Sequence, residues 1–192
     1  GDCKVSQIAV DLPATGNASI SIDLVGLSRS ATGAQVLTSP AAETITGIMS
    51  SVNGKLYLNG AALTNVSGVQ ITISNSAASA GAVIGSNSAP DVSTGRIKVS
   101  GQFTALFDGV TAQALFDAET AIALATVVTA DETPTSDFVG FTLGKIKLTG
   151  DAPDDGEKSI MRTYPFTAEI NRAGGATLAY DDTIITVQDS AA

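Results

Sequence analysis

Residues 66–73 read Val-Ser-Gly-Val-Gln-Ile-Thr-Ile, and the spacing of their apolar side chains decides the fold class. Val69, Ile71 and Ile73 recur at every second position, which puts them on one face of a β-strand. The same alternation recurs at Ile8, Val10 and Leu12, at Ile20, Ile22 and Leu24, and at Leu56 and Leu58. We therefore expect each of these runs to be a strand with one buried face.

The composition also indicates a mainly β protein. The chain has 192 residues, of which 44% are apolar, enough for one large domain or one and a half small ones. Trp is absent, and the abundant small and β-branched residues suit extended structure better than long helices. No apolar run reaches the roughly 18 residues that a membrane span needs, so we expect no membrane insertion.

Residues 138–148 change parity in the middle of a strand pattern. Phe141 and Leu143 occupy odd positions, whereas Ile146 and Leu148 occupy even ones. A slip of one residue would move the second pair to the opposite face of a regular strand. Gly144 lies at the change, so we expect a β-bulge there.

Residues 160–170 form another strand pattern with one irregular position. We expect its even positions to make one face that is buried apart from Arg162: Ile160, Arg162, Tyr164, Phe166, Ala168 and Ile170. Pro165 lies on the other face and has no N–H for a ladder, so it predicts an edge position or a local break.

Residues 108–120 contain the good helix formers of the chain, and we expect one helix there. Its apolar stripe is expected to consist of Val110, Ala114, Leu115 and Ala118. Asp108 or Thr111 is placed to cap its start. We expect further strands at residues 121–129 and 183–188.

The sequence contains an internal repeat in two pieces. Residues 5–12 match residues 66–73, and residues 15–24 match residues 94–103 with a shared Thr-Gly at the start. No strand like residues 54–60 precedes the first copy, so that copy lacks its beginning. Gly1 and the position of the first methionine, Met49, also predict a processed product or part of something longer.

The repeat predicts two domains. We expect residues 1–45 to be a partial first β-domain with a connector, and residues 46–192 to be a complete second one. The connector is expected at residues 28–45, which are rich in Ser, Ala, Thr and Gly.

The second copy carries an insertion of small, uncharged residues between its two pieces. One interpretation is a mobile surface loop, although loops of this length are usually functional or disordered. Val83 and Ile84 at its centre favour contact with a neighbouring subunit. The candidate contact residues are Asn75, Ser79, Val83, Ile84, Asn87 and Pro90.

Composition argues against several kinds of active site. The chain has no His, which excludes Ser-His-Asp and Cys-His catalysis and every His-based metal site. The lone Cys3 cannot form an internal disulfide or a thiolate metal site. With ten basic residues and a net charge of −9, the chain shows no basic stripe for specific nucleic-acid binding. We therefore predict no catalytic residue, cofactor or metal.

Asp151, Asp154, Asp155 and Glu157 form an acidic cluster in a Gly/Pro-rich segment. Pro153-Asp-Asp-Gly favours a turn between two strands. Contact with a Lys or Arg of a neighbouring subunit and Ca²⁺ binding are the less favoured alternatives. Pro153 falls where the second ligand of an EF-hand loop would be, so that pattern fails.

Four motifs resemble the tail tube (major tail) proteins of long-tailed bacteriophages. They are Lys55-Leu-Tyr-Leu-Asn-Gly60, residues 66–73, residues 147–158 with Pro-Asp-Asp-Gly-Glu-Lys at the end, and Thr163-Tyr-Pro-Phe-Thr-Ala168. The likeness covers most of residues 46–192.

This resemblance implies an antiparallel β-sandwich or barrel flanked by one short helix, in the virion tail. It implies homo-oligomeric rings, trimers or hexamers, that assemble in the host cytoplasm and stack into a tube with other tail proteins. The genome would pass through an acidic lumen without specific binding. The insertion resembles the segment that bridges stacked rings. The alternative function is a carbohydrate- or receptor-binding β-sandwich of a virion or cell surface, and an enzyme is less favoured still.

Overall fold

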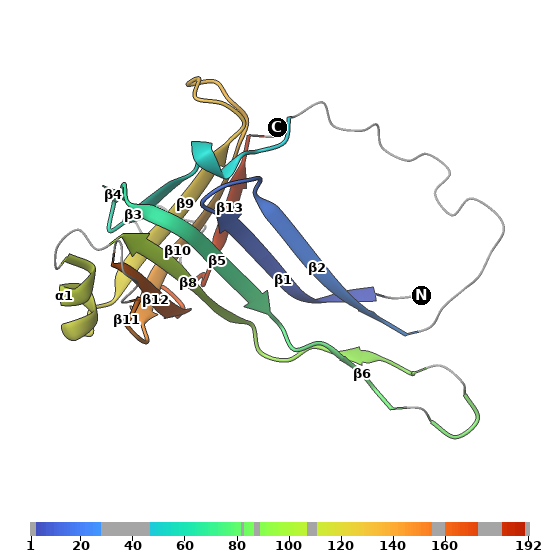
Figure 1. The fold of residues 1–192 in the computed structure, drawn as a ribbon. Coiled ribbons are helices and arrows are strands. Elements are labelled where there is room, and N and C mark those ends of the chain that lie inside the picture. Colours follow the sequence, from blue (N-terminus) through green and yellow to red (C-terminus); the bar gives the residue numbers. More distant parts are fainter. Residues whose placement is uncertain are drawn as a thin grey trace.

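The fold is an antiparallel, mainly β sandwich with one short α-helix among the residues that the structure describes (Figure 1). The computed structural model describes residues 3–27, 47–81, 83–86, 89–106, 111–154, 160–172 and 182–190. Its strands are β1 (Cys3–Pro13), β2 (Ser19–Gly26), β3 (Lys55–Leu58), β4 (Ala61–Leu63), β5 (Val66–Ser74), β6 (Ala78–Ser79), β7 (Val92–Ser93), β8 (Lys98–Leu106), β9 (Ile122–Thr129), β10 (Phe138–Leu148), β11 (Ala152–Asp154), β12 (Met161–Ala168) and β13 (Thr186–Asp189). The helices are the 3-10 helix η1 (Ser51–Asn53) and α1 (Thr111–Asp117). This confirms the predicted fold class.

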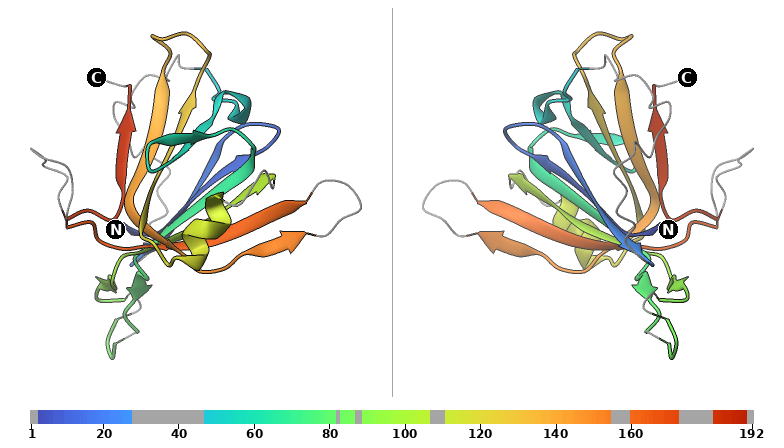
Figure 2. Two further views of the ribbon diagram at one scale, coloured as in Figure 1. Left: turned by 90° about the vertical axis from the view of Figure 1, so that its left-hand side faces the viewer. Right: turned by 90° about the vertical axis from the view of Figure 1, so that its right-hand side faces the viewer.

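The strands join in the order β2-β1-β5-β8-β12-β10-β9-β3-β4, with β11 beside β12 and β13 beside β10. The first five strands, here called the five-strand sheet, make one layer. The second layer consists of β10, β9, β3, β4 and β13, and Figure 2 shows the two layers diverging from their shared side. The core between them includes Phe103 and Phe166 from the five-strand sheet and Leu124 and Leu143 from the second layer.

Strand β10 takes part in both layers because it bends at Gly144. Its pairing with β9 shifts register between Leu143 and Ile146, which is the predicted β-bulge. Phe141, Leu143 and Ile146 are all buried despite their different parity. A Cβ at Gly144 would lie 2.6 Å from Nδ2 of Asn171, so a larger residue at the bend requires the Asn171 side chain to move.

Pro165 marks the predicted local break. On one flank of β12, the neighbouring strand changes from β11 at residues 161–163 to β10 at residues 166–168. The carbonyl of Pro165 faces this gap, where it accepts a hydrogen bond from the amide of Thr149 (2.8 Å). N–H and C=O groups of one residue point to the same flank of a strand, so the missing N–H falls where no ladder runs.

The burial predictions hold in the middle of the sheet and fail at its ends. Buried residues include Val10, Leu56, Ile71 and Tyr164, as expected. The prediction that β2 buries one face is wrong, because Ile20, Ile22 and Leu24 are 54%, 56% and 62% exposed. Ile160 and Ile170 are also exposed, at the two ends of the β12 run. These positions extend beyond the area that the opposite layer covers.

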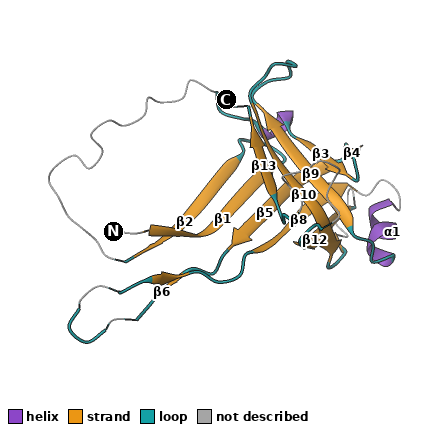
Figure 3. Cartoon of the chain, turned by 180° about the vertical axis from the view of Figure 1, so that it is seen from behind, coloured by secondary structure: helices purple, strands orange, loops and turns teal. Residues whose placement is uncertain are grey.

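Helix α1 is shorter than predicted and lies at the periphery of the sandwich (Figure 3). Leu115 packs against the core, but Ala114 and Ala118 are exposed, so the predicted stripe is wrong. The alanines contribute little apolar area, so the packing of Leu115 against the core fixes the position of the helix. Val110 and Asp108 and the side chain of Thr111 lie outside the described part. No helix in the described part is long and apolar enough to cross a membrane.

The C-terminal strand is also shorter than predicted, because β13 covers residues 186–189 rather than 183–188. Thr183 instead forms an isolated bridge with Asn171.

The two repeat copies lie side by side as the strand pairs β1–β2 and β5–β8, which meet along an antiparallel β1–β5 ladder. Each pair has a register shift at the aligned position, between Val5 and Gln7 in one and between Val66 and Gly68 in the other. The skipped serines behave alike: each hydroxyl donates to a carbonyl across the ladder at 3.2 Å. The division into domains at residue 45 stays a prediction, and β1 and β2 share one sheet with β5.

Candidate functional site

The solvent-facing side of the five-strand sheet is built from amide and hydroxyl groups. We call it the polar face: Gln7, Ala9 and Asp11 of β1, Ser19, Ser21 and Asp23 of β2, Gln70, Thr72 and Ser74 of β5, Lys98, Ser100 and Gln102 of β8, and Thr163 and Thr167 of β12. Alternation along each strand explains it, since the intervening residues point into the core.

The rows of this face run straight across the sheet. One row joins Ser19, Asp11, Gln70 and Gln102, which are successive cross-strand partners. The amide of Gln102 donates to Oε1 of Gln70 at 2.9 Å. A second contact, between the hydroxyls of Thr104 and Thr163, is also 2.9 Å long. Such side-chain pairs stabilise neighbouring strands and hold the polar groups in an ordered array.

The polar face carries few charges and no aromatic ring. Its carboxylates are Asp11 and Asp23, and its ammonium group is Lys98 at one end. A surface of this kind offers nucleic acid neither paired phosphate contacts nor a stacking platform.

The predicted contact segment projects from the sandwich as an arm, residues 75–97 between β5 and β8 (Figure 1). Strands β6 and β7 pair within it. Its base is fixed to β1, because the amide of Asn75 donates to the carbonyl of Ser6 (3.1 Å) and the ammonium of Lys4 donates to the carbonyl of Val92. Lys4 also lies 3.8 Å from the carboxylate of Asp91.

The five predicted contact residues that the structure describes are spread along the arm rather than gathered at one place. Asn75 lies at the base, where its carbonyl accepts from the amide of Gly95 (2.7 Å), and Ser79 lies in β6. Val83 and Ile84 are exposed near the tip, and Pro90 is exposed on the returning chain. Asn87 lies outside the described residues.

The acidic cluster does not behave as one unit. Asp151 forms an ion pair with Arg162 at 2.5 Å, and the two side chains are only 11% and 18% exposed. Asp151 and Arg162 are therefore paired within the chain and largely buried, contrary to the expectation that Arg162 is the unburied position of its face. Asp154 is exposed in β11, while Asp155 and Glu157 lie outside the described residues.

A second ion pair is exposed. Lys145 lies 2.8 Å from Glu169, with side chains 39% and 44% exposed. Hydrogen bonding to Lys145 and its charge hold the pKa of Glu169 below the usual value for glutamate.

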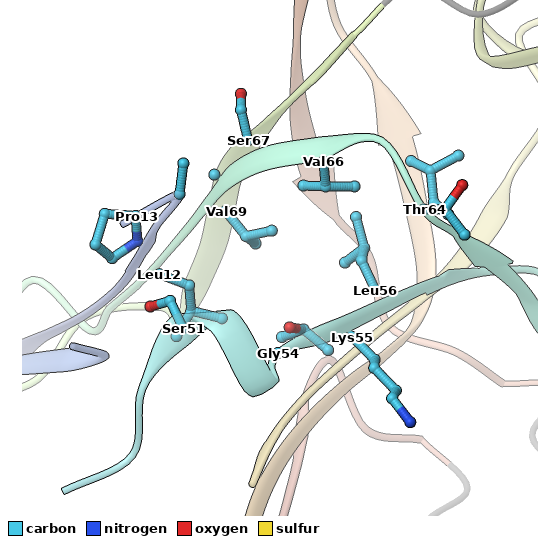
Figure 4. A pocket seen from close by; sticks show the side chains of 14 residues that line it. Leu12, Pro13, Ser51, Gly54, Lys55, Leu56, Thr64, Val66, Ser67 and Val69 are labelled. Atoms are coloured by element: carbon cyan, nitrogen blue, oxygen red, sulfur yellow. The ribbon is translucent and has the colours of Figure 1, made fainter. Parts of the chain in front are cut away.

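A cleft beside η1 has few groups that could serve catalysis. Figure 4 shows a cleft of about 110 Å³ between η1, β3 and the start of β5. Among the described residues that line it, Lys55 is the ionisable one, and its amine points away from the other labelled side chains. Within the described ranges, no three acidic or cysteine side chains come together as a metal site.

The sequence interpretation missed the exposed apolar side of β2. The alternation of Ile20, Ile22 and Leu24 was visible, but it indicated a buried face. Only the sheet order shows that β2 is the end strand, with no described strand beyond it.

Comparison with known proteins gives one match. The family model of the phage tail tube protein matches residues 1–168, which include the polar face and the arm. No curated protein is significantly similar to the chain.

Proposed function

The chain belongs to the phage tail tube protein family, and from this premise we propose that its copies form stacked rings whose channel is lined by the polar face. The family role is structural: a subunit of the virion tail that assembles with itself and with other tail proteins. The ring, a trimer or a hexamer, and the passage of the genome through it are part of the proposal.

The polar face is the observation that supports this function. DNA binds proteins mainly through Lys and Arg, which displace counterions from its phosphates. The polar face instead has amides, hydroxyls, two carboxylates and a single ammonium group at one end, that of Lys98, on a chain with a net charge of −9. DNA moving past such a wall meets repulsion and weak hydrogen bonding, so it is not retained.

The arm and the acidic cluster have supporting parts in this proposal. The arm, with Asn75, Ser79, Val83, Ile84, Asn87 and Pro90, bridges one ring to the next. Its projection from the sandwich and its exposed Val83 and Ile84 support this role. Asp154, Asp155 and Glu157 contact Lys or Arg of a neighbouring subunit. Each such exposed pair is worth about 1 kcal/mol or less.

Lysines introduced into the channel test the proposal. We expect tubes of the Gln70→Lys/Ser100→Lys variant to bind duplex DNA with a salt-dependent affinity, whereas wild-type tubes bind none. The two positions are diagonal on the polar face, which keeps the new charges apart. Binding is measured by co-sedimentation of a labelled duplex with assembled tubes.

The matched control places two lysines on the helix, in the Ala114→Lys/Ala118→Lys variant. Both positions are exposed, and they lie in or directly after α1 rather than on the polar face. The proposed orientation is wrong if the two variants bind DNA equally, or if wild-type tubes already retain it.

A further inference from the structure

The core side of the five-strand sheet continues onto β2 without a cover. We call Ile20, Ile22 and Leu24 the edge row. Their cross-strand partners are Val10, Ile8 and Val5, so the edge row points to the same side of the sheet as the core.

The exposed fraction of the apolar side chains rises abruptly at β2, the end strand of the sheet. One apolar row crosses the sheet from Phe166 through Gly101, Ile71 and Val10 to Ile20. Ile71 and Val10 are 1% and 3% exposed, whereas Ile20 is 54% exposed. The pattern of the core thus extends one strand further than the layer that buries it.

Comparison of the two repeat copies indicates which contacts β2 lacks. Because the β1–β2 and β5–β8 pairs share a bulge, the ladder position of Ile22 opposite Ile8 corresponds to that of Phe103 opposite Val69, although the sequence match aligns Phe103 with Leu24. Phe103 is fully buried, and its ring stacks on that of Tyr164 in β12 at a centroid distance of 5.2 Å. Strand β8 therefore has a neighbouring strand and an aromatic cover, and β2 has neither among the described residues.

Strand β2 also lacks the usual protection of an edge. Edge strands of monomeric proteins carry lysine, proline or bulges that prevent pairing with other chains. The eight residues of β2 include no lysine or proline, and the one charged side chain, Asp23, lies on the polar face. Among the described residues, no strand pairs with the free edge of β2, and its apolar side is exposed.

We propose that β2 and its edge row dock against a second copy of this chain, which supplies the strand partner and cover that β12 supplies to β8. The inference rests on the proposed function, and self-association is the family property that selects this occupant. The edge row has no charge, so two chains of net charge −9 meet there without burying unpaired carboxylates. The contact joins β2 to a different surface of the next copy, as ring closure requires.

A charge placed in the edge row tests the docking. We expect Ile22→Lys to raise the concentration for half-assembly at least tenfold, since docking would bury an unpaired ammonium. The thermal midpoint of the dispersed subunit should stay unchanged, because Ile22 is exposed there. The control is Ala114→Lys, which places the same charge at an exposed position of α1, outside β2, and should assemble like the wild type. Assembly is followed by sedimentation velocity and electron microscopy.

Cysteine labelling gives a second readout. In a Cys3→Ser background, Ile22→Cys should react with maleimide in dispersed subunits and be protected in assemblies, whereas Ser21→Cys should react in both. Protection in dispersed subunits would mean that the chain covers its own edge row, and the inference would fail. Normal assembly of Ile22→Lys would overturn the docking alone. A wild-type chain that stays monomeric at every concentration would overturn the docking and the proposed function together.

Discussion

Gly101 is the tightest point of the five-strand sheet. A Cβ built on it would lie 2.1 Å from the carbonyl oxygen of Gln70 and 2.6 Å from the ring of Phe166. Both neighbours come from adjacent strands, so the need for glycine depends on sheet order. The sequence offered no sign of it, whereas Gly144 was predictable because the parity of its own strand changes there.

Replacing this glycine should be costly. We expect Gly101→Ala to lower the free energy of unfolding by about 1–3 kcal/mol, the usual cost of overpacking. Urea denaturation of the dispersed subunit measures it. Ser100→Ala, at the neighbouring exposed position, should stay within about 0.5 kcal/mol of the wild type. Equal stability of the two variants would contradict the close approach of the strands.

The two ion pairs predict unequal costs. Asp151→Ala leaves the charge of Arg162 largely buried, and we expect a loss of about 3 kcal/mol in unfolding free energy. Glu169→Ala removes the exposed partner of Lys145 and should cost clearly less stability than Asp151→Ala. Chemical denaturation of both variants in the same buffer compares them. A cost for Glu169→Ala that equals or exceeds that of Asp151→Ala would refute the assignment of the buried pair.

At the scale of elements, strand existence was predictable and strand burial was not. Alternation of apolar residues identified β1, β2, β3, β5 and β9 because it depends only on the neighbours in the chain. Whether a strand is central or terminal depends on pairing between distant segments, so the exposed side of β2 was missed. The arm was found as an insertion in a repeat, but its fixation through Lys4 required the fold.

The arm should be separable from the sandwich. We expect replacement of residues 76–94 by Asn-Gly to leave a folded subunit, because that pair suits a tight turn between β5 and β8. If the arm bridges rings, the variant forms rings that do not stack. Circular dichroism checks folding, and negative-stain microscopy compares ring and tube populations.

The Val83→Ser/Ile84→Ser variant refines that test, since it keeps the arm and removes the apolar side chains near its tip. We expect shorter tubes than the wild type. Tubes of full length from the arm-replacement variant would exclude the bridging role.

At the scale of the whole molecule, the sandwich separates three surfaces by chemistry. The polar face is low in charge, the edge row is apolar, and the arm projects from one end of the sandwich. The sequence predicted a conduit from a family resemblance and from the lack of catalytic groups. It did not predict which carboxylates face the channel, because the side of the sheet to which a side chain points depends on how the strands pair.

A cryo-electron microscopy map of assembled tubes tests the central claim most directly. We predict that Gln70, Gln102 and Asp11 line the channel and that a strand of the neighbouring copy lies beside β2. A map with the polar face on the outside of the tube, or with β2 unpaired at the subunit boundary, would contradict it.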